Sequence, residues 1–180
     1  MNDRVYNKGL DALRSPERIA RLEIPRVVDL CLQNNDIASV LDIGTGSGVF
    51  AEAFGAHVAK IAGIDTNPEM IAKATEFVPG ADFRLASAGE LPFENESFDL
   101  VFMGAVFHEV NDYQVAMDEA FRVAVKEVAL LEWTYKEEQV GPPLNHRLQE
   151  SFIFEVAGKA GFSKYESIPL NQLVLYKLYK

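Results

Sequence analysis

The sequence predicts an α/β domain built on a mainly parallel, seven-stranded sheet with an antiparallel last strand and helices on both faces. Two observations support this prediction. After Asn34 and Asn35, short apolar runs rich in β-branched residues alternate with helical stretches, which is typical of strands joined by helical crossovers. Near the C-terminus only a few residues separate two further apolar runs, so that last pair of strands is expected to be antiparallel.

The composition is that of one globular domain. The chain has 180 residues, 48% of them hydrophobic, which is enough to bury a core. Within that domain we distinguish an N-terminal helical segment, residues 1–38, from a core, residues 39–180. The single cysteine, Cys31, excludes an internal disulfide and suits a reducing, cytoplasmic compartment. No run approaches the ~20 apolar residues of a membrane span. A net charge of −10 disfavours nucleic acid, so neither a membrane nor a nucleic-acid partner is expected.

The N-terminal segment is expected to become helical after a polar, irregular start at residues 1–14. Ser15 followed by Pro16 matches an N-cap with proline in the first turn, so a helix begins there. Pro25 can sit only in a first helical turn, which predicts a second helix from about Arg26 to Gln33.

The core is expected to alternate strands with helices. The predicted strands are residues 40–43, 60–64, 82–85, 98–103 and 125–131. The predicted helices are residues 47–54, 68–75 and 113–123, with a single turn at most at 89–91. The last third should hold a helix over 145–160, capped by Gly161, and strands over 165–168 and 173–179.

The strongest motif is the glycine-rich turn after the first predicted strand, Asp42-Ile43-Gly44-Thr45-Gly46-Ser47-Gly48. Glycines let the backbone approach a ligand closely, and the free N–H groups of the following helix offer hydrogen-bond donors. The spacing differs from the G-x-G-x-x-G turn of dinucleotide-binding proteins, because the third glycine comes one residue early. Asp42 would repel a pyrophosphate and attract an ammonium group, so the turn indicates a ligand that carries an amino acid.

Asp65 ends the second predicted strand, as the ribose-binding acid does in nucleotide-binding βαβ units. One carboxylate can accept hydrogen bonds from both ribose hydroxyls. Met70, in the helix that Pro68 begins, is a candidate for contact with an adenine ring, although a core contact would explain it equally well.

These residues resemble the class I S-adenosylmethionine-dependent methyltransferases, and more narrowly the small branch related to ubiquinone/menaquinone-biosynthesis methyltransferases. The resemblance spans roughly residues 16–180 and includes Leu91-Pro92-Phe93, Phe107-His108-Glu109-Val110 and Leu131-Glu132-Trp133. It implies a Rossmann-like methyltransferase fold, S-adenosylmethionine as the cofactor and a methyl acceptor as the second ligand. The cofactor-binding residues that it implies are Asp42, Gly44, Thr45, Gly46, Gly48, Asp65, Thr66, Met70, Ser87, Ala88, Met103 and Gly104.

Two departures from the family pattern stand out. Ser87 occupies the place after the third strand where the family usually has an aspartate for the adenine amino group, so the N–H of Ala88 is expected to contribute more. The usual proline-glycine-glycine turn before the fifth strand is absent, and residues 122–127 run almost directly into that strand.

His108, at the mouth of the fourth strand, is the best-placed candidate for a general base. Methyl transfer depends mainly on alignment and desolvation, but a nucleophile that bears a proton also needs a base. The alternative is that the His108 ring only forms part of the pocket wall and takes no part in proton transfer. His146 and Glu132 are further candidates, His57 is expected far from the site, and the scattered histidines give no metal-ligand spacing.

The expected function is S-adenosylmethionine-dependent methyl transfer to a small-molecule acceptor, with residues 1–38 and the loop from Trp133 to Asn145 as the substrate lid. A catalytically degenerate binding or regulatory protein of the same fold is an alternative, since the chain is short and Ser87 departs from the pattern. A NAD-dependent oxidoreductase is disfavoured by the glycine spacing and by Asp42. The acceptor atom and the oligomeric state, a homodimer included, stay open.

Overall fold

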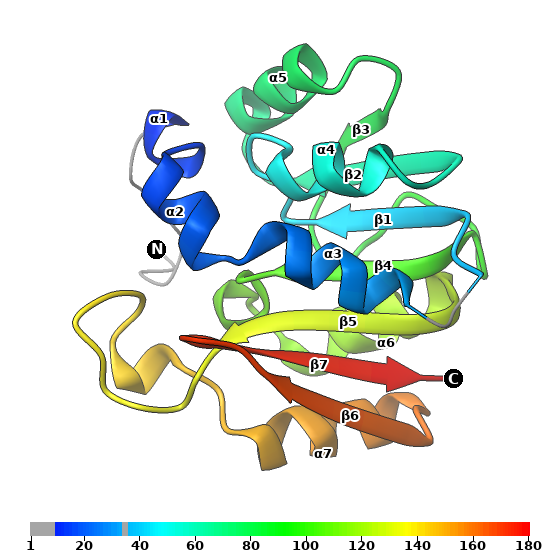
Figure 1. The fold of residues 1–180 in the computed structure, drawn as a ribbon. Coiled ribbons are helices and arrows are strands. Elements are labelled where there is room, and N and C mark those ends of the chain that lie inside the picture. The colour runs from blue at the N-terminus through cyan, green and yellow to red at the C-terminus, as the bar shows by residue number, and fades with distance from the viewer. Residues whose placement is uncertain (1–9, 34–35) are drawn as a thin grey trace.

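The computed structural model describes residues 10–33 and 36–180 and shows one seven-stranded sheet between two layers of helices (Figure 1). The strand order is β3-β2-β1-β4-β5-β7-β6. All pairs from β3 to β5 are parallel, whereas β7 runs antiparallel to both β5 and β6. The predicted fold class, including the antiparallel last strand, is confirmed.

Three short helices precede the sheet: α1 (Leu10–Leu13), α2 (Pro16–Arg21) and α3 (Ile24–Leu32). Ser15 caps α2 as predicted, its hydroxyl accepting a hydrogen bond from the Arg18 N–H at 3.3 Å. Pro25 lies in the first turn of α3, also as predicted. Helix α1 falls within a segment expected to be irregular, so that expectation was wrong for residues 10–13, while residues 1–9 lie outside the described part.

The first half of the core is β1 (Ser39–Ile43), α4 (Val49–Gly55), β2 (Lys60–Asp65), α5 (Pro68–Phe77) and β3 (Asp82–Leu85). Helix α4 begins two residues later than predicted because Gly48 adopts a left-handed conformation, with φ of +77°, at the N-cap. The segment 89–91 contains no helix, and Glu90 instead forms an isolated bridge with Ser87 across a short turn.

The second half is β4 (Phe98–Gly104), η1 (Phe107–Glu109), α6 (Tyr113–Val123), β5 (Ala124–Trp133), η2 (Leu144–His146), α7 (Glu150–Ala160), β6 (Lys164–Pro169) and β7 (Leu173–Tyr179). Helix α6 leads directly into β5, as the missing turn predicted. Gly161 caps α7 with a φ of +112°, which confirms its predicted role.

The helix predicted from residue 145 begins only at Glu150. Arg147 has an extended backbone, with φ of −86° and ψ of 150°, so it interrupts any helix between η2 and α7. Residues 134–147, which we call the strap, contain no helix or strand apart from the short turn η2. The strap leaves the carboxyl end of β5 and returns to α7 (Figure 1).

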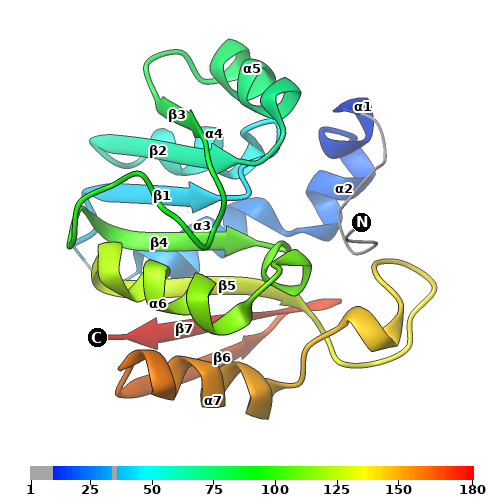
Figure 2. The ribbon, with the colours of Figure 1, turned by 180° about the vertical axis from the view of Figure 1, so that it is seen from behind.

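Two hydrophobic clusters lie on the two faces of the sheet. Helices α3 and α4 cover one face together with α5, and α6 and α7 cover the other, as the two opposite views show (Figures 1 and 2). The carboxyl ends of the parallel strands meet at one edge, where α1, α2 and the strap also lie. That edge is where open α/β sheets bind ligands. No helix in residues 10–33 or 36–180 is long and apolar enough to cross a membrane.

Candidate active site

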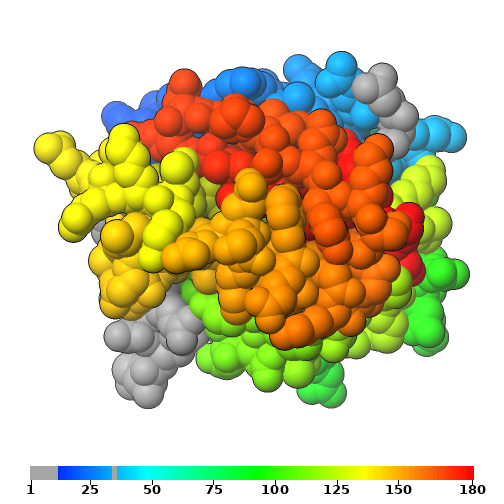
Figure 3. Space-filling model, turned by 90° about the horizontal axis from the view of Figure 1, so that it is seen from below, coloured from blue at the N-terminus to red at the C-terminus, as the bar shows by residue number. Residues whose placement is uncertain are grey.

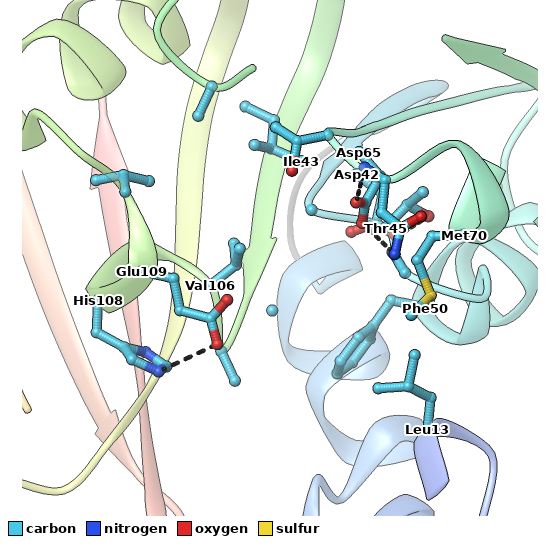
Figure 4. A pocket seen from close by; sticks show the side chains of 18 of the residues that line it. Leu13, Asp42, Ile43, Thr45, Phe50, Asp65, Met70, Val106, His108 and Glu109 are labelled. Carbon is cyan, nitrogen blue, oxygen red and sulfur yellow. Dashed lines mark hydrogen bonds and ion pairs between the residues drawn. The ribbon is translucent and has the colours of Figure 1, made fainter. Parts of the chain in front are cut away.

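A cavity of about 910 Å³ opens at the carboxyl edge of the sheet. Its size is near the upper end of the range for small-molecule and cofactor sites. The walls come from α1 and α2, the turn after β1, the end of β2, the segment after β3, the segment from Gly104 to Asp112, and the strap. In the close-up, Asp42, Thr45 and Asp65 lie on one side and His108 with Glu109 on the other (Figure 4).

The glycine-rich turn lines one side of the cavity in the conformation that its sequence requires. Gly44 and Gly46 have φ of +69° and +55°, a region that L side chains rarely adopt. A Cβ on Gly44 would lie 2.4 Å from Val106 Cγ2, so only glycine fits there. Gly44, Thr45 and Gly46 line the cavity. Gly48, also predicted to bind the cofactor, is instead packed against Ala74 of α5 and does not line it.

Asp42 lines the cavity below this turn, although almost all of its surface is buried. Only 2% of it is exposed, and the Thr45 hydroxyl donates a 2.7 Å hydrogen bond to Asp42 Oδ2. Burial raises the pKa of Asp42 to about 7, the Asp65 charge adds to the rise, and the Thr45 hydrogen bond opposes it. The carboxyl group therefore gains a proton close to neutral pH, and a ligand cation nearby would release it.

Asp65 lies half-buried at the end of β2, where its carboxylate is already oriented by the backbone. Its Oδ2 accepts from the Gly46 N–H and its Oδ1 from the Asn67 N–H, each at 2.9 Å. A carboxylate has lone pairs for further hydrogen bonds, so both oxygens can still accept from a diol. Thr66 and Met70 line the cavity next to it.

The remaining predicted cofactor residues divide between the cavity and the core. Ser87 and Ala88 line the cavity beyond the end of β3, and Gly104 lines it at the end of β4. Met103 does not, because its side chain is fully buried in the hydrophobic cluster beneath α6. In a parallel strand the side chains alternate between faces, and that of Met103 points into the core instead of the site.

His108 faces the cavity from η1 and is held there by a buried carboxylate. His108 Nδ1 lies 2.8 Å from Glu132 Oε2, and the His108 N–H donates to Glu132 Oε1 at 3.2 Å. Only 3% of His108 and 1% of Glu132 are exposed. Because Glu132 engages Nδ1, the other ring nitrogen, Nε2, is directed toward Glu109, whose Oε1 lies 3.7 Å away (Figure 4).

The electrostatics of this group favour the imidazolium. Burial by itself lowers the pKa of His108, but the charge and hydrogen bond of Glu132 and the charge of Glu109 outweigh burial and the opposing charge of Arg147. The net pKa of His108 is raised above its usual value. A carboxylate that fixes one ring nitrogen of a histidine at the edge of a cavity orients the ring, as it does in histidines that act as bases.

The structure adds cavity residues that the sequence interpretation missed. Arg18 and Arg21 lie three residues apart on α2, so they share the helix face that lines the cavity. Arg14 holds this segment against the glycine-rich turn, because its guanidinium donates to the Ser47 carbonyl at 2.9 Å and to Glu52 at 2.8 Å. Their spacing on a predicted helix could have identified the two arginines of α2; no local signal identifies Arg14.

The two other histidines lie in different surroundings. His146 of η2 lines the cavity, while His57 is exposed after α4 and takes no part in it. Among the described residues, no group of three or more histidine, cysteine or acidic side chains could hold a metal ion.

The fold and this site define a class I S-adenosylmethionine-dependent methyltransferase. The model of the family described as "Methyltransferase domain" matches residues 41–131, and the chain belongs to this family. The cofactor is S-adenosylmethionine, as predicted from the resemblance.

Curated relatives match only the central part of the chain. An uncharacterized methyltransferase, YcgJ, of Bacillus subtilis is 36% identical over 89 residues, which are 47% of this chain and 35% of the relative. A demethylmenaquinone methyltransferase of Chlorobaculum parvum is 34% identical over 85 residues, again 47% of this chain and 35% of the relative. The chain thus spans about a third of the length of these relatives.

Solved structures match nearly the whole chain. A S-adenosylmethionine-dependent methyltransferase from Aquifex aeolicus superimposes with a TM-score of 0.82 at 22% identity, covering 94% of this chain and 95% of that one. The magnesium protoporphyrin IX methyltransferase of Synechocystis, solved with bound S-adenosylmethionine, gives a TM-score of 0.70 at 14% identity and covers 97% and 86% of the two chains. These likenesses establish the fold.

The residues of this chain fit S-adenosylmethionine chemically. Asp65 offers acceptors for ribose hydroxyls, and the arginines of α2 offer cations for a carboxylate. Among the described side chains that line the cavity, Ser47 has a buried Oγ with no hydrogen-bond partner. A buried hydroxyl without a partner is costly, so this site suits a polar ligand.

Proposed function

We propose that this chain transfers a methyl group from S-adenosylmethionine to a small-molecule acceptor bound in the same cavity. The observation that carries the proposal is the single cavity that runs from the glycine-rich turn to the His108–Glu132 pair. When bound, S-adenosylmethionine supplies a methyl group that is attached to a sulfonium. Once the methyl group is transferred, the rest of the cofactor departs as a neutral thioether.

On the cofactor side, we assign Asp65 to the ribose hydroxyls and the segment from Ala86 to Gly89, with Met70, to the adenine. Arg18 and Arg21 are assigned to the methionine carboxylate, since they are the cations that α2 turns toward the cavity. Asp42 acts through the turn: it accepts a hydrogen bond from the Thr45 hydroxyl, and a cationic ligand group nearby would favour its charged form.

On the acceptor side, we assign the proton of the attacking group to His108 Nε2. As the new bond to the methyl carbon forms, the acceptor's N–H or O–H becomes acidic, and the neutral imidazole takes its proton. Glu132 is the positioning residue, because it fixes Nδ1 and stabilises the imidazolium that results. This device suits an acceptor that attacks through a protonated nitrogen or oxygen.

The acceptor is proposed to be small because of what encloses the cavity. Helices α1 and α2 lie over the turn and the strap closes the opposite side, so the two form the substrate lid proposed here. Trp133, Pro142 and Pro143 line the acceptor side, and such rigid apolar surfaces favour a flat molecule. The buried thiol of Cys31 supports a cytoplasmic location.

The alternative is a binding or regulatory protein of the same fold, which the exposed Ser87 keeps open. Calorimetric titration with S-adenosylmethionine, S-adenosylhomocysteine and NAD tests the ligand class. Release of S-adenosylhomocysteine in the presence of a panel of small amines, phenols and activated carbon acids then tests for turnover. Binding of the two sulfur ligands with turnover of at least one acceptor supports the proposal, and tight binding of NAD alone contradicts it.

A further inference from the structure

Arg147 is a buried arginine whose charge is met by backbone carbonyls. Only 4% of it is exposed, and among the ion pairs of the described residues none involves Arg147. Its guanidinium donates to four carbonyl oxygens of the strap, those of Thr134 at 3.0 Å, Lys136 at 2.6 Å, Val140 at 2.8 Å and Pro142 at 2.9 Å.

These bonds give the strap a fixed shape that its own backbone does not supply. The strap has no sheet ladder and only one short helical turn, so most of its carbonyls need another donor. A planar guanidinium can serve several acceptors in fixed directions, whereas a lysine ammonium is a single point of charge. A buried cation without a carboxylate is costly, and here the hydrogen bonds offset that cost.

Trp133 provides the surface on which the strap rests. Gly141 has a φ of +87°, and a Cβ on it would lie 2.7 Å from the indole ring, so the backbone lies directly against the ring. The Arg147 guanidinium is 5.6 Å from the centre of that ring. As a result only 6% of Trp133 is exposed, although the strap projects at one end of the molecule (yellow in Figure 3).

The inner side of the strap is also part of the cavity wall. The cavity is lined by four residues of the strap, Gly141, Pro142, Pro143 and His146. The Arg147 bond to the Pro142 carbonyl therefore sets the position of residues that would contact an acceptor.

We propose that Arg147 is a positioning residue for the methyl acceptor, which holds residues 134–147 as a wall that is already formed before any ligand binds. The acceptor role of the wall rests on the proposed function, but its fixed shape does not. Arg147 touches neither the glycine-rich turn nor Asp65, so its loss should leave the cofactor side intact.

The test uses Trp133, the only tryptophan in the chain, as its probe. Acrylamide quenching of Trp133 emission is measured in the wild type, Arg147→Lys, Arg147→Met and Gly141→Ala. Arg122→Lys is the matched control, because Arg122 likewise donates to backbone carbonyls, those of Leu91 and Phe93, but away from the cavity. Calorimetry with S-adenosylhomocysteine follows in each variant.

We expect quenching to rise several-fold in both Arg147 variants and in Gly141→Ala, with S-adenosylhomocysteine affinity within about threefold of the wild type. Arg122→Lys should leave quenching unchanged even if it lowers the melting temperature. Unchanged quenching in the Arg147 variants overturns the proposal, as does a rise that occurs only together with loss of S-adenosylhomocysteine binding.

An acceptor found by the panel adds the functional readout. Arg147→Lys should then raise the acceptor KM by about tenfold or more with little change in the KM for S-adenosylmethionine. Equal effects on both KM values would overturn the positioning role. If the wild type binds no S-adenosylhomocysteine, the proposed function fails, and quenching alone still decides whether Arg147 fixes the strap.

Discussion

The two sides of the cavity are built by different means. The cofactor side consists of the turn after β1 and the end of β2, where left-handed glycines and one carboxylate shape a local stretch of backbone. The acceptor side is held by side chains: His108 pairs with Glu132, which lies 24 positions away on the neighbouring strand, and Arg147 binds the carbonyls of an irregular segment. This difference implies that the cofactor side tolerates little variation, whereas the acceptor side can change its chemistry through single side chains.

The same difference explains what the sequence could predict. Positive φ at Gly44 and Gly46 and a strand ending in Asp65 are local requirements, so the glycine-rich turn and its acid were predictable. His108 was predictable as a candidate from its place after the fourth strand. Its pairing with Glu132 was not, because the two residues are 24 positions apart and meet only when β4 and β5 pair.

The errors have equally specific causes. The helix predicted from residue 145 fails because the Arg147 side chain is engaged by the strap, a contact that helix propensity does not report. Met103, which was expected at the cofactor, does not line the cavity because its position on β4 turns the side chain into the core. Gly48, also expected at the cofactor, does not line the cavity. A glycine is required there by its φ of +77° and by its close packing on α5.

The largest expected effect concerns the acceptor side. His108→Asn should lower kcat by roughly 10²–10⁴-fold while S-adenosylmethionine affinity stays within a few fold, because Nε2 is the proposed proton acceptor. Steady-state rates with an acceptor from the panel measure this. His57→Asn, on an exposed site outside the cavity, is the control and should leave the rate unchanged. A normal kcat in His108→Asn would remove His108 from the mechanism.

The pH dependence sharpens the same assignment. Because the pKa of His108 is raised, its imidazole loses its proton at a higher pH than an ordinary histidine, so kcat should fall as pH decreases through that raised pKa. Glu132→Gln removes the main charge that raises it, while Glu109 and the opposing Arg147 remain. The acidic limb should therefore move to lower pH and kcat should also fall. An acidic limb that does not move would contradict the role of Glu132.

Asp42 tests the cofactor side through stability. Its folded-state pKa of about 7 exceeds the unfolded value, so the native state holds the extra proton and wild-type stability falls as pH rises from about 4 to 7. Asp42→Asn lacks this loss. The unfolding free energy of the variant minus that of the wild type should therefore increase by roughly 1–3 kcal/mol as pH rises from 5 to 8. Urea unfolding at the two pH values measures the gain.

Asp99→Asn is the matched control for Asp42. Burial by itself raises the pKa of Asp99, but hydrogen bonds from the Ala38 N–H, Lys126 and Ser39 outweigh it, so the net pKa is lowered. Its contribution to stability is therefore constant from pH 5 to pH 8, and the difference from wild type should not change with pH. Parallel behaviour of the two variants would mean that the carboxyl group of Asp42 titrates normally.

The smallest effect is expected at Ser87. Restoring the aspartate that the family usually has there, by Ser87→Asp, should keep S-adenosylmethionine affinity within a few fold or tighten it, because the residue is exposed and lines the cavity. Calorimetry measures the change, with Ser87→Asn as the uncharged comparison. A large loss of affinity would place the adenine elsewhere.

The separation of the two sides is tested most directly by titrating S-adenosylhomocysteine into Asp65→Ala and His108→Asn in one calorimetric series. Asp65→Ala removes charge-assisted acceptors worth roughly 1.5–3 kcal/mol each, so affinity should fall at least about tenfold. His108→Asn should bind within a few fold of the wild type. Unchanged binding in Asp65→Ala, or a comparable loss in His108→Asn, would contradict the division of the cavity into a cofactor side and an acceptor side.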